Sequence, residues 1–110
     1  MDPFAGPWVD GAPVRSGAVD IAAFQATIAA TYGDRDADRG IAPSVAWLCE
    51  EVGELAQAAR KGTPAQQLHE LADVLAWVAS IAQQLGLSLD EAAQRYAAGC
   101  PVCSTLPCDC

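Results

Sequence analysis

Residues 47–55 have the sequence WLCEEVGEL and residues 70–75 have the sequence ELADVL. Each stretch holds two acidic residues three positions apart, Glu51 with Glu54 and Glu70 with Asp73. On a helix such residues share one face, with Cβ atoms roughly 5–6 Å apart. Two carboxylates roughly 4–5 Å apart repel by about 3–4 kcal/mol at an effective dielectric constant near 20, and only a bound divalent metal or shifted pKa values would relieve that repulsion. The two stretches therefore predict neighbouring helices whose acids face one crevice, and oxygen ligands favour Mg²⁺ or Mn²⁺ over zinc.

A solvated acidic helix face is the alternative interpretation of these four acids. Such faces usually carry basic residues three or four positions away, which form ion pairs with the acids. No lysine or arginine occurs between Ala46 and Ala59 or between Gln66 and Gln94. The lack of these partners favours a cation site over a solvated face.

Helix signals surround both stretches. Thr63, Pro64 and Gln66 combine an N-cap, a proline in the first turn and a capping-box glutamine, so a helix is expected to begin here. Asp20 and Ser88 are further N-cap candidates, and a glycine follows the expected end of each helix. No alternating strand pattern occurs, and this predicts an all-α bundle. We expect helices over residues 21–32, 44–61, 64–85 and 89–98, with a polar loop over residues 33–43.

The composition predicts a thin core. Hydrophobic residues make up 52% of the 110-residue chain, but 23 residues are alanine and only 6% are aromatic. A single small domain buries a modest fraction of its surface. We therefore expect a homodimer or homotetramer in which packing between chains completes the bundle. The expected core residues of the second helix are Leu48, Val52, Leu55 and Ala59.

Composition divides the chain into three segments and excludes some partners. Residues 1–18 are expected to be a mobile N-terminal tail, residues 19–99 the helical domain and residues 100–110 a cysteine-rich tail. The net charge of −8 argues against nucleic acid as a partner, since no basic stripe would neutralise its phosphates. With no run of 18 apolar residues and no signal-like segment, we expect no membrane contact and a cytoplasmic protein.

The pattern Glu-Glu-x-x-Glu, a spacer of 15 residues and Glu-x-x-Asp resembles the MazG-type nucleoside triphosphate pyrophosphohydrolases, a branch of the all-α NTP pyrophosphatases. The resemblance extends from about Ile21 to Tyr96 and includes the residues around the acids. It implies a MazG-like bundle of about four helices. It also implies hydrolysis of the α–β phosphoanhydride to a nucleoside monophosphate and pyrophosphate. The ligands of Mg²⁺ that it implies are Glu51, Glu54, Glu70 and Asp73.

Residues beside the acids are candidates for catalysis and phosphate binding. Glu50 could take a proton from the attacking water or hold a second metal, and a plain surface acid is the alternative. Arg60 and Lys61 could contact the β- and γ-phosphates, although cations also suit the C-terminus of a helix. Arg35 and Arg39, in the expected loop, could reach phosphate as well.

Three larger side chains lie close to the acids in sequence. Trp47 and Trp77 are one helical turn from them and could wall a pocket for the base, and a core role is the alternative. His69 is turned about 100° from Glu70 on a helix, so we expect a surface or lid residue and not a ligand.

The segment 100–110 contains four cysteines, Cys100, Cys103, Cys108 and Cys110. Two cysteine pairs with a proline in each spacer could fold around one tetrahedral structural Zn²⁺ through four thiolates. A redox-active or disulfide-bonded tail and a disordered tail are the alternatives. The fifth cysteine, Cys49, is expected to be a small buried hydrophobic residue.

The sequence therefore supports two alternative functions from different classes. The first is Mg²⁺-dependent hydrolysis of nucleoside triphosphates that removes unwanted nucleotides. The second is a non-catalytic, all-α oligomeric module whose zinc-binding cysteine tail contacts a protein partner. The completeness of the acidic set favours the first.

Overall fold

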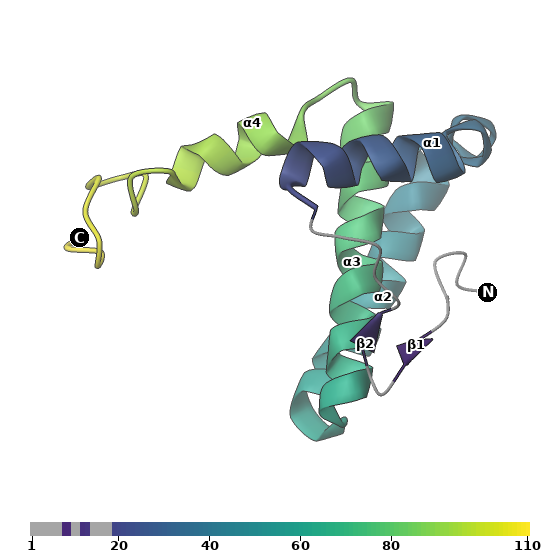
Figure 1. The fold of residues 1–110 in the computed structure, drawn as a ribbon, viewed down its shortest axis with the longest axis horizontal. Helices are drawn as coiled ribbons and strands as arrows, with labels where there is room; N and C mark the ends of the chain where they lie inside the picture. Colours follow the sequence, from purple (N-terminus) through teal and green to yellow (C-terminus); the bar gives the residue numbers. More distant parts are fainter. Residues whose placement is uncertain (1–7, 10–11, 14–18) are drawn as a thin grey trace.

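The computed structural model of the chain describes residues 8–9, 12–13 and 19–110. The helices are α1 (Ile21–Arg39), α2 (Ile41–Lys61), α3 (Pro64–Gln84) and α4 (Leu89–Ala93), followed by the short 3-10 helix η1 (Gln94–Tyr96). Helices α2 and α3 run antiparallel and side by side, and α1 crosses them at the end where α3 finishes (Figure 1). The all-α prediction is confirmed.

The expected N-caps form as the sequence predicts. The Thr63 side chain accepts a hydrogen bond from the Gln66 backbone N–H at 3.2 Å, and Gln66 Oε1 accepts one from the Thr63 N–H at 2.9 Å. Asp20 caps α1 and Ser88 caps α4 in the same way, each accepting from a backbone N–H three residues on. These caps satisfy N–H groups that a helix leaves without a partner, and they explain where three helices begin.

The segment 33–43, expected to be a polar loop, is helical except at Gly40. Helix α1 continues to Arg39, and Gly40, with a φ of 84°, turns the chain into α2. Asp36 explains the continuation, because it is buried and its Oδ1 accepts a hydrogen bond from Arg39 Nη1 at 2.8 Å. The burial of Asp36 and this contact within the helix together outweigh the low helix propensity of a glycine, about 1 kcal/mol. Pro43 is tolerated in the first turn of α2, where N–H groups have no helical partner.

Two short strands lie in the N-terminal segment. Strand β1 (Trp8–Val9) pairs antiparallel with β2 (Ala12–Pro13), and β2 contacts α3. Strands of two residues are too short for an alternating pattern to reveal them. The rest of the predicted mobile tail lies outside the described residues.

The core within one chain is small and partly polar. Ile28, Ala76 and Ala79 form its buried apolar cluster. Phe24, Tyr32 and Leu89 pack against that cluster. The largest fully buried side chains are those of Trp77, Glu51, Asp73, Ser44 and Ser80. Four of these five side chains are polar, which is unusual for a core and indicates that some of these buried residues have a role other than packing.

The core stripe predicted for the second helix is wrong for the single chain. Val52 and Ala59 are exposed, and Leu48 and Leu55 are only partly buried. The reason is that the neighbouring stripe of α2, which carries Glu51 and Ala58, is the buried one. Cys49, expected to be buried, is exposed as well.

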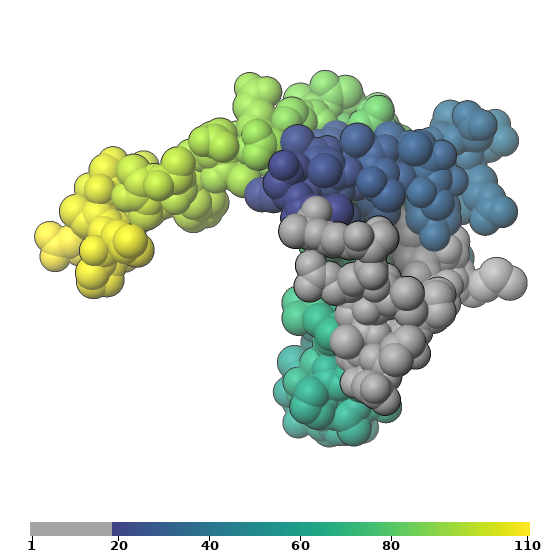
Figure 2. Space-filling model, viewed as in Figure 1, coloured from purple at the N-terminus to yellow at the C-terminus, as the bar shows by residue number. Residues whose placement is uncertain are grey.

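Helix α4, η1 and the cysteine-rich segment extend away from the bundle (Figures 1 and 2). The expected fourth helix, residues 89–98, is shorter in the structure because the helix changes to the 3-10 form at Gln94 and ends at Tyr96. Among the described helices, none is by itself long and apolar enough to cross a membrane, while α3 and residues 89–96 pass that test only as a pair bent by 113°.

Candidate metal centre

Carboxylates from α2 and α3 converge between the two helices. One oxygen each from Glu51, Glu70 and Asp73 lies within 4.8 Å of the others. We call these three residues the acidic cluster. Glu51 and Asp73 have only 1% of their surface exposed, and Glu70 is partly buried. The structure therefore brings together three of the four acids that the sequence predicts as metal ligands.

Glu54, the fourth predicted ligand, lies beside the acidic cluster and is exposed. Its charge acts on Glu70. Burial raises the pKa of the Glu70 carboxyl above its ordinary value, and the neighbouring charge of Glu54 raises that pKa further. Both effects disfavour the ionised carboxylate in the absence of a cation.

The donor set of the acidic cluster fits a hard divalent cation. Glu51 Oε2, Glu70 Oε2 and Asp73 Oδ2 are all shielded from solvent. Two full charges 4.8 Å apart repel by about 3.5 kcal/mol at an effective dielectric constant near 20, so three ionised groups need compensation. Carboxylate oxygens are the ligands that Mg²⁺ and Mn²⁺ prefer, which agrees with the sequence expectation.

His69 contacts the acidic cluster, which the sequence interpretation missed. Its Nε2 atom lies 3.1 Å from Asp73 Oδ2, and its side chain is 27% exposed. The two residues are four positions apart on α3, and this spacing was the available signal. His69 therefore orients the Asp73 carboxylate, and a protonated His69 would offset the negative charge of Asp73.

A polar pocket of about 420 Å³ opens beside the acidic cluster. Glu54 and Glu70 line it together with Lys61, the last residue of α2. Arg60, its predicted companion, is exposed and does not line this pocket. The remaining lining residues are Gln57, Ala58, Gly62 and Gln66.

The aromatic residues next to the acids form a stack. The rings of Trp47 and Trp77 lie 5.9 Å apart with planes 5° from parallel, and the guanidinium of Arg39 lies 5.0 Å from the centre of the Trp77 ring. Trp77 is completely buried, as in the core alternative, whereas Trp47 is partly exposed. Arg39 also pairs with Asp36, so in this structure it supports the fold.

Two other predicted residues stand apart from the acidic cluster. Glu50 is exposed on α2 and does not belong to the cluster, and Arg35 is exposed on α1. Their roles in proton transfer and phosphate binding stay predictions.

A comparison with protein-family models matches residues 39–98 to the MazG nucleotide pyrophosphohydrolase domain. The chain belongs to the MazG family. The match includes the whole acidic cluster and Lys61, and it ends before the cysteine-rich segment. MazG domains are nucleotide pyrophosphohydrolases, so the family places the chain among the hydrolases that act on nucleotides. No curated protein matched the chain.

Outside the matched MazG region, the four cysteines of the tail also come together. Hydrogen bonding by the Thr105 hydroxyl, aided by backbone N–H groups, lowers the pKa of the Cys103 thiol to about 5. The thiol of Cys110, hydrogen-bonded with that of Cys108, has its pKa raised to about 11. The tail is therefore a second cluster of chemically distinct ligands, at the far end of α4 from the bundle (Figure 1).

Proposed function

We propose that this MazG domain hydrolyses nucleoside triphosphates at the α–β phosphoanhydride, giving a nucleoside monophosphate and pyrophosphate, with Mg²⁺ or Mn²⁺ as the cofactor. The observation that carries the proposal is the acidic cluster, in which three carboxylates from two helices meet within 4.8 Å inside the matched region. Removal of unwanted nucleotides from the cytoplasmic pool is the role we propose for this activity.

We assign metal binding and proton transfer to different residues of the site. Glu51, Glu70 and Asp73 would hold the cation, with Glu54 at its open side. A bound Mg²⁺ neutralises phosphate charge and lowers the pKa of the attacking water. Glu50 remains our candidate for accepting a proton from that water.

The polar pocket supplies a place for the polyphosphate. The protein has a net charge of −8, which repels nucleotides, so a local cation is needed beside the acids. Lys61 provides one in the pocket that Glu70 also lines. Gln66 uses its Oε1 in the capping box, which leaves its amide N–H groups to donate to phosphate oxygens.

We further propose that a second copy of the chain covers the apolar face of α2 and α3. Leu68, Leu71 and Leu75 recur along one face of α3 and are all exposed, as is Val52 on α2. The three leucines form an apolar stripe at helical spacing on α3, and the buried apolar cluster within a single chain is small. A dimer with twofold symmetry would pack this stripe against itself, as self-complementary helix faces do.

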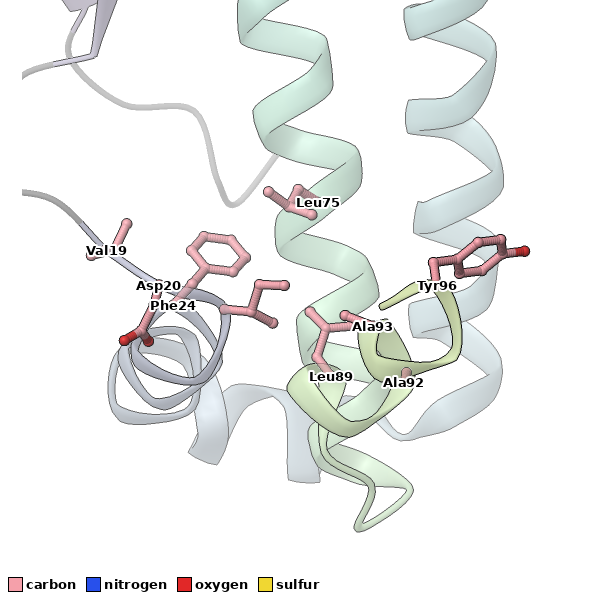
Figure 3. Close-up of a pocket in the computed structure, with 9 residues that line it drawn as sticks. Val19, Asp20, Phe24, Leu75, Leu89, Ala92, Ala93 and Tyr96 are labelled. Atoms are coloured by element: carbon pink, nitrogen blue, oxygen red, sulfur yellow. The ribbon is translucent and has the colours of Figure 1, made fainter. Parts of the chain in front are cut away.

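An apolar groove continues this stripe. Its volume is about 440 Å³, and Phe24 of α1, Leu75 of α3 and Leu89 of α4 lie around it (Figure 3). Leu75 belongs to both the groove and the stripe, so one partner surface could cover the two. A homodimer or homotetramer would bury this apolar surface.

Product analysis tests the proposed reaction. A panel of canonical and modified nucleoside triphosphates is incubated with Mg²⁺, and pyrophosphate and inorganic phosphate are measured separately. We expect pyrophosphate in an amount equal to the monophosphate, loss of this activity in Asp73→Asn and its retention in Asp34→Asn, which changes an exposed acid of α1. Release of phosphate with a nucleoside diphosphate would contradict α–β cleavage. No product from any nucleotide would favour the non-catalytic module.

A further inference from the structure

The thiols of Cys100, Cys103, Cys108 and Cys110 meet at one point. Their sulfur atoms all lie within 4.8 Å of one another. The separations are 3.6 Å between Cys100 and Cys110, 3.3 Å between Cys108 and Cys110 and 4.0 Å between Cys103 and Cys108. A tetrahedron with metal–sulfur bonds of about 2.3 Å has edges of about 3.8 Å. The four sulfurs therefore already approximate the ligand shell of a tetrahedral metal.

The backbone closes around this cluster through specific contacts. The Cys100 N–H donates to the Thr105 carbonyl at 3.0 Å, and the Ser104 N–H donates to the Cys100 carbonyl at 2.7 Å. Gly99 begins the turn with a φ of 98°, and a Cβ atom there would lie 2.5 Å from the Thr105 carbonyl oxygen. Only glycine fits this close approach, so residue 99 must be a glycine for the backbone of Thr105 to pack against the start of the segment.

Hydrogen-bond donors surround the sulfur of Cys103. The Thr105 hydroxyl oxygen lies 2.9 Å from this sulfur, and the Asp109 N–H donates to it at 3.4 Å. Groups that hydrogen-bond to a metal ligand orient it and increase the metal's affinity. These contacts link the first and second halves of the segment through one ligand atom.

Apolar packing does not account for the order of this segment. It extends away from the bundle (Figure 2), and its largest apolar side chains, Val102 and Leu106, are 78% and 87% exposed. Fixing a backbone costs roughly 1–2 kcal/mol per residue, which exposed side chains cannot offset. A bound metal can offset it, because metal binding and folding are coupled in small sites of this kind.

We propose that Cys100, Cys103, Cys108 and Cys110 bind one structural Zn²⁺ ion through four thiolates. Four protein ligands fill a tetrahedral shell, so no position stays open for substrate or water. Each thiol that binds gives up its proton to the solvent. Soft thiolates select zinc, whereas the carboxylates of the acidic cluster select hard cations, so the two metals bind at separate sites. This site stands independently of the proposed hydrolysis.

Metal analysis of the whole chain tests the assignment. Protein purified without chelator and under reducing conditions should contain about one zinc per chain. The double variant Cys103→Ser and Cys108→Ser should contain almost none. Cys49→Ser is the matched control, since Cys49 is exposed on α2 and lies outside the cluster, and it should keep its zinc. Iron in place of zinc, no metal in the wild-type chain, or a disulfide mapped within residues 100–110 would overturn the proposal.

Hydrogen exchange tests whether the zinc orders the segment. The amides of Cys100 and Ser104 should exchange slowly in the zinc-loaded protein, because both are hydrogen-bonded. Removal of the zinc should accelerate their exchange at least tenfold while amides in α2 and α3 remain as slow as before. Protection that persists at both amides after zinc removal would contradict a metal-ordered segment.

Discussion

Replacement of Glu51 by glutamine tests the electrostatics of the acidic cluster. The substitution keeps the size of the side chain and removes one buried charge that lies within 4.8 Å of two other carboxylates. Each ionised pair at this distance costs about 3.5 kcal/mol at an effective dielectric constant near 20. Glu70 has a raised pKa and can relieve part of this cost by taking up a proton. We therefore expect Glu51→Gln to raise the free energy of unfolding of the metal-free protein by about the repulsion of one carboxylate pair, about 3.5 kcal/mol.

Thermal unfolding with and without Mg²⁺ gives the measurement. In the presence of a chelator, the variant should melt roughly 14–28 °C above the wild-type chain, since about 1 kcal/mol shifts the melting temperature of such a domain by 4–8 °C. Saturating Mg²⁺ should stabilise the wild-type chain by about 2.7 kcal/mol at a hundredfold excess over its dissociation constant. The variant, which lacks one ligand, should gain almost nothing. Asp34→Asn serves as a control and should behave as the wild-type chain in both conditions.

Two results would refute this reasoning. The variant could be less stable than the wild-type chain without metal, which would mean that the three carboxylates do not repel one another as their separation implies. Alternatively, Mg²⁺ could stabilise variant and wild type equally, which would mean that the cation binds elsewhere.

Further predictions concern the pocket, the pH dependence, the core and the assembly. Lys61→Ala should raise KM for nucleoside triphosphates roughly tenfold or more, because a hydrogen bond to a charged group contributes about 1.5–3 kcal/mol; an unchanged KM in steady-state assays would remove Lys61 from the phosphate site. Without metal, the raised pKa of Glu70 means that the folded protein holds the Glu70 proton more tightly than the unfolded chain does. This proton binding stabilises the folded protein fully at pH values below 4.5, the ordinary pKa of the group, and the stabilisation is lost as pH rises through the raised pKa. The free energy of unfolding should thus be less sensitive to pH above 4.5 in Glu70→Gln than in the wild-type chain, as urea titrations at several pH values would measure. Trp77→Ala should destabilise the protein by about 3–5 kcal/mol in denaturant titrations, since the ring is fully buried. Leu71→Glu should give a monomer in light scattering where the wild-type chain gives a dimer or tetramer, and a monomeric wild-type chain that is still active would contradict the proposed assembly.

Part of the acidic cluster could be predicted from the sequence because the spacing of residues within one helix is a local property. This holds for Glu70 and Asp73, which lie three apart on α3 and share a face, and the capping box at Thr63 placed the start of α3 correctly. The same spacing pairs Glu51 with Glu54 on α2, but only Glu51 joins the cluster, because the approach of α2 to α3 buries it and leaves Glu54 exposed. His69 was accessible to the same argument, since it lies four positions before Asp73. Its position next to Glu70 in the sequence hid this relation.

The parts that could not be predicted depend on contacts between distant residues. The segment 33–43 carries charges and glycines that favour a loop, and only the burial of Asp36 and the stacking of Arg39 on Trp77 explain why it is helical. Helix α2 has an apolar stripe and an acidic stripe side by side. The periodicity of the sequence predicts that the apolar stripe faces the core, whereas in the structure Glu51 is the buried residue.

Anomalous scattering from Mn²⁺ in crystals of the protein would test the central claim most directly, because it locates the cation without reference to activity. We predict one or more Mn²⁺ peaks bounded by the carboxylates of Glu51, Glu70 and Asp73, and their loss in crystals of Asp73→Asn. Active crystals in which Mn²⁺ binds elsewhere, with the acidic cluster free of metal, would contradict the account.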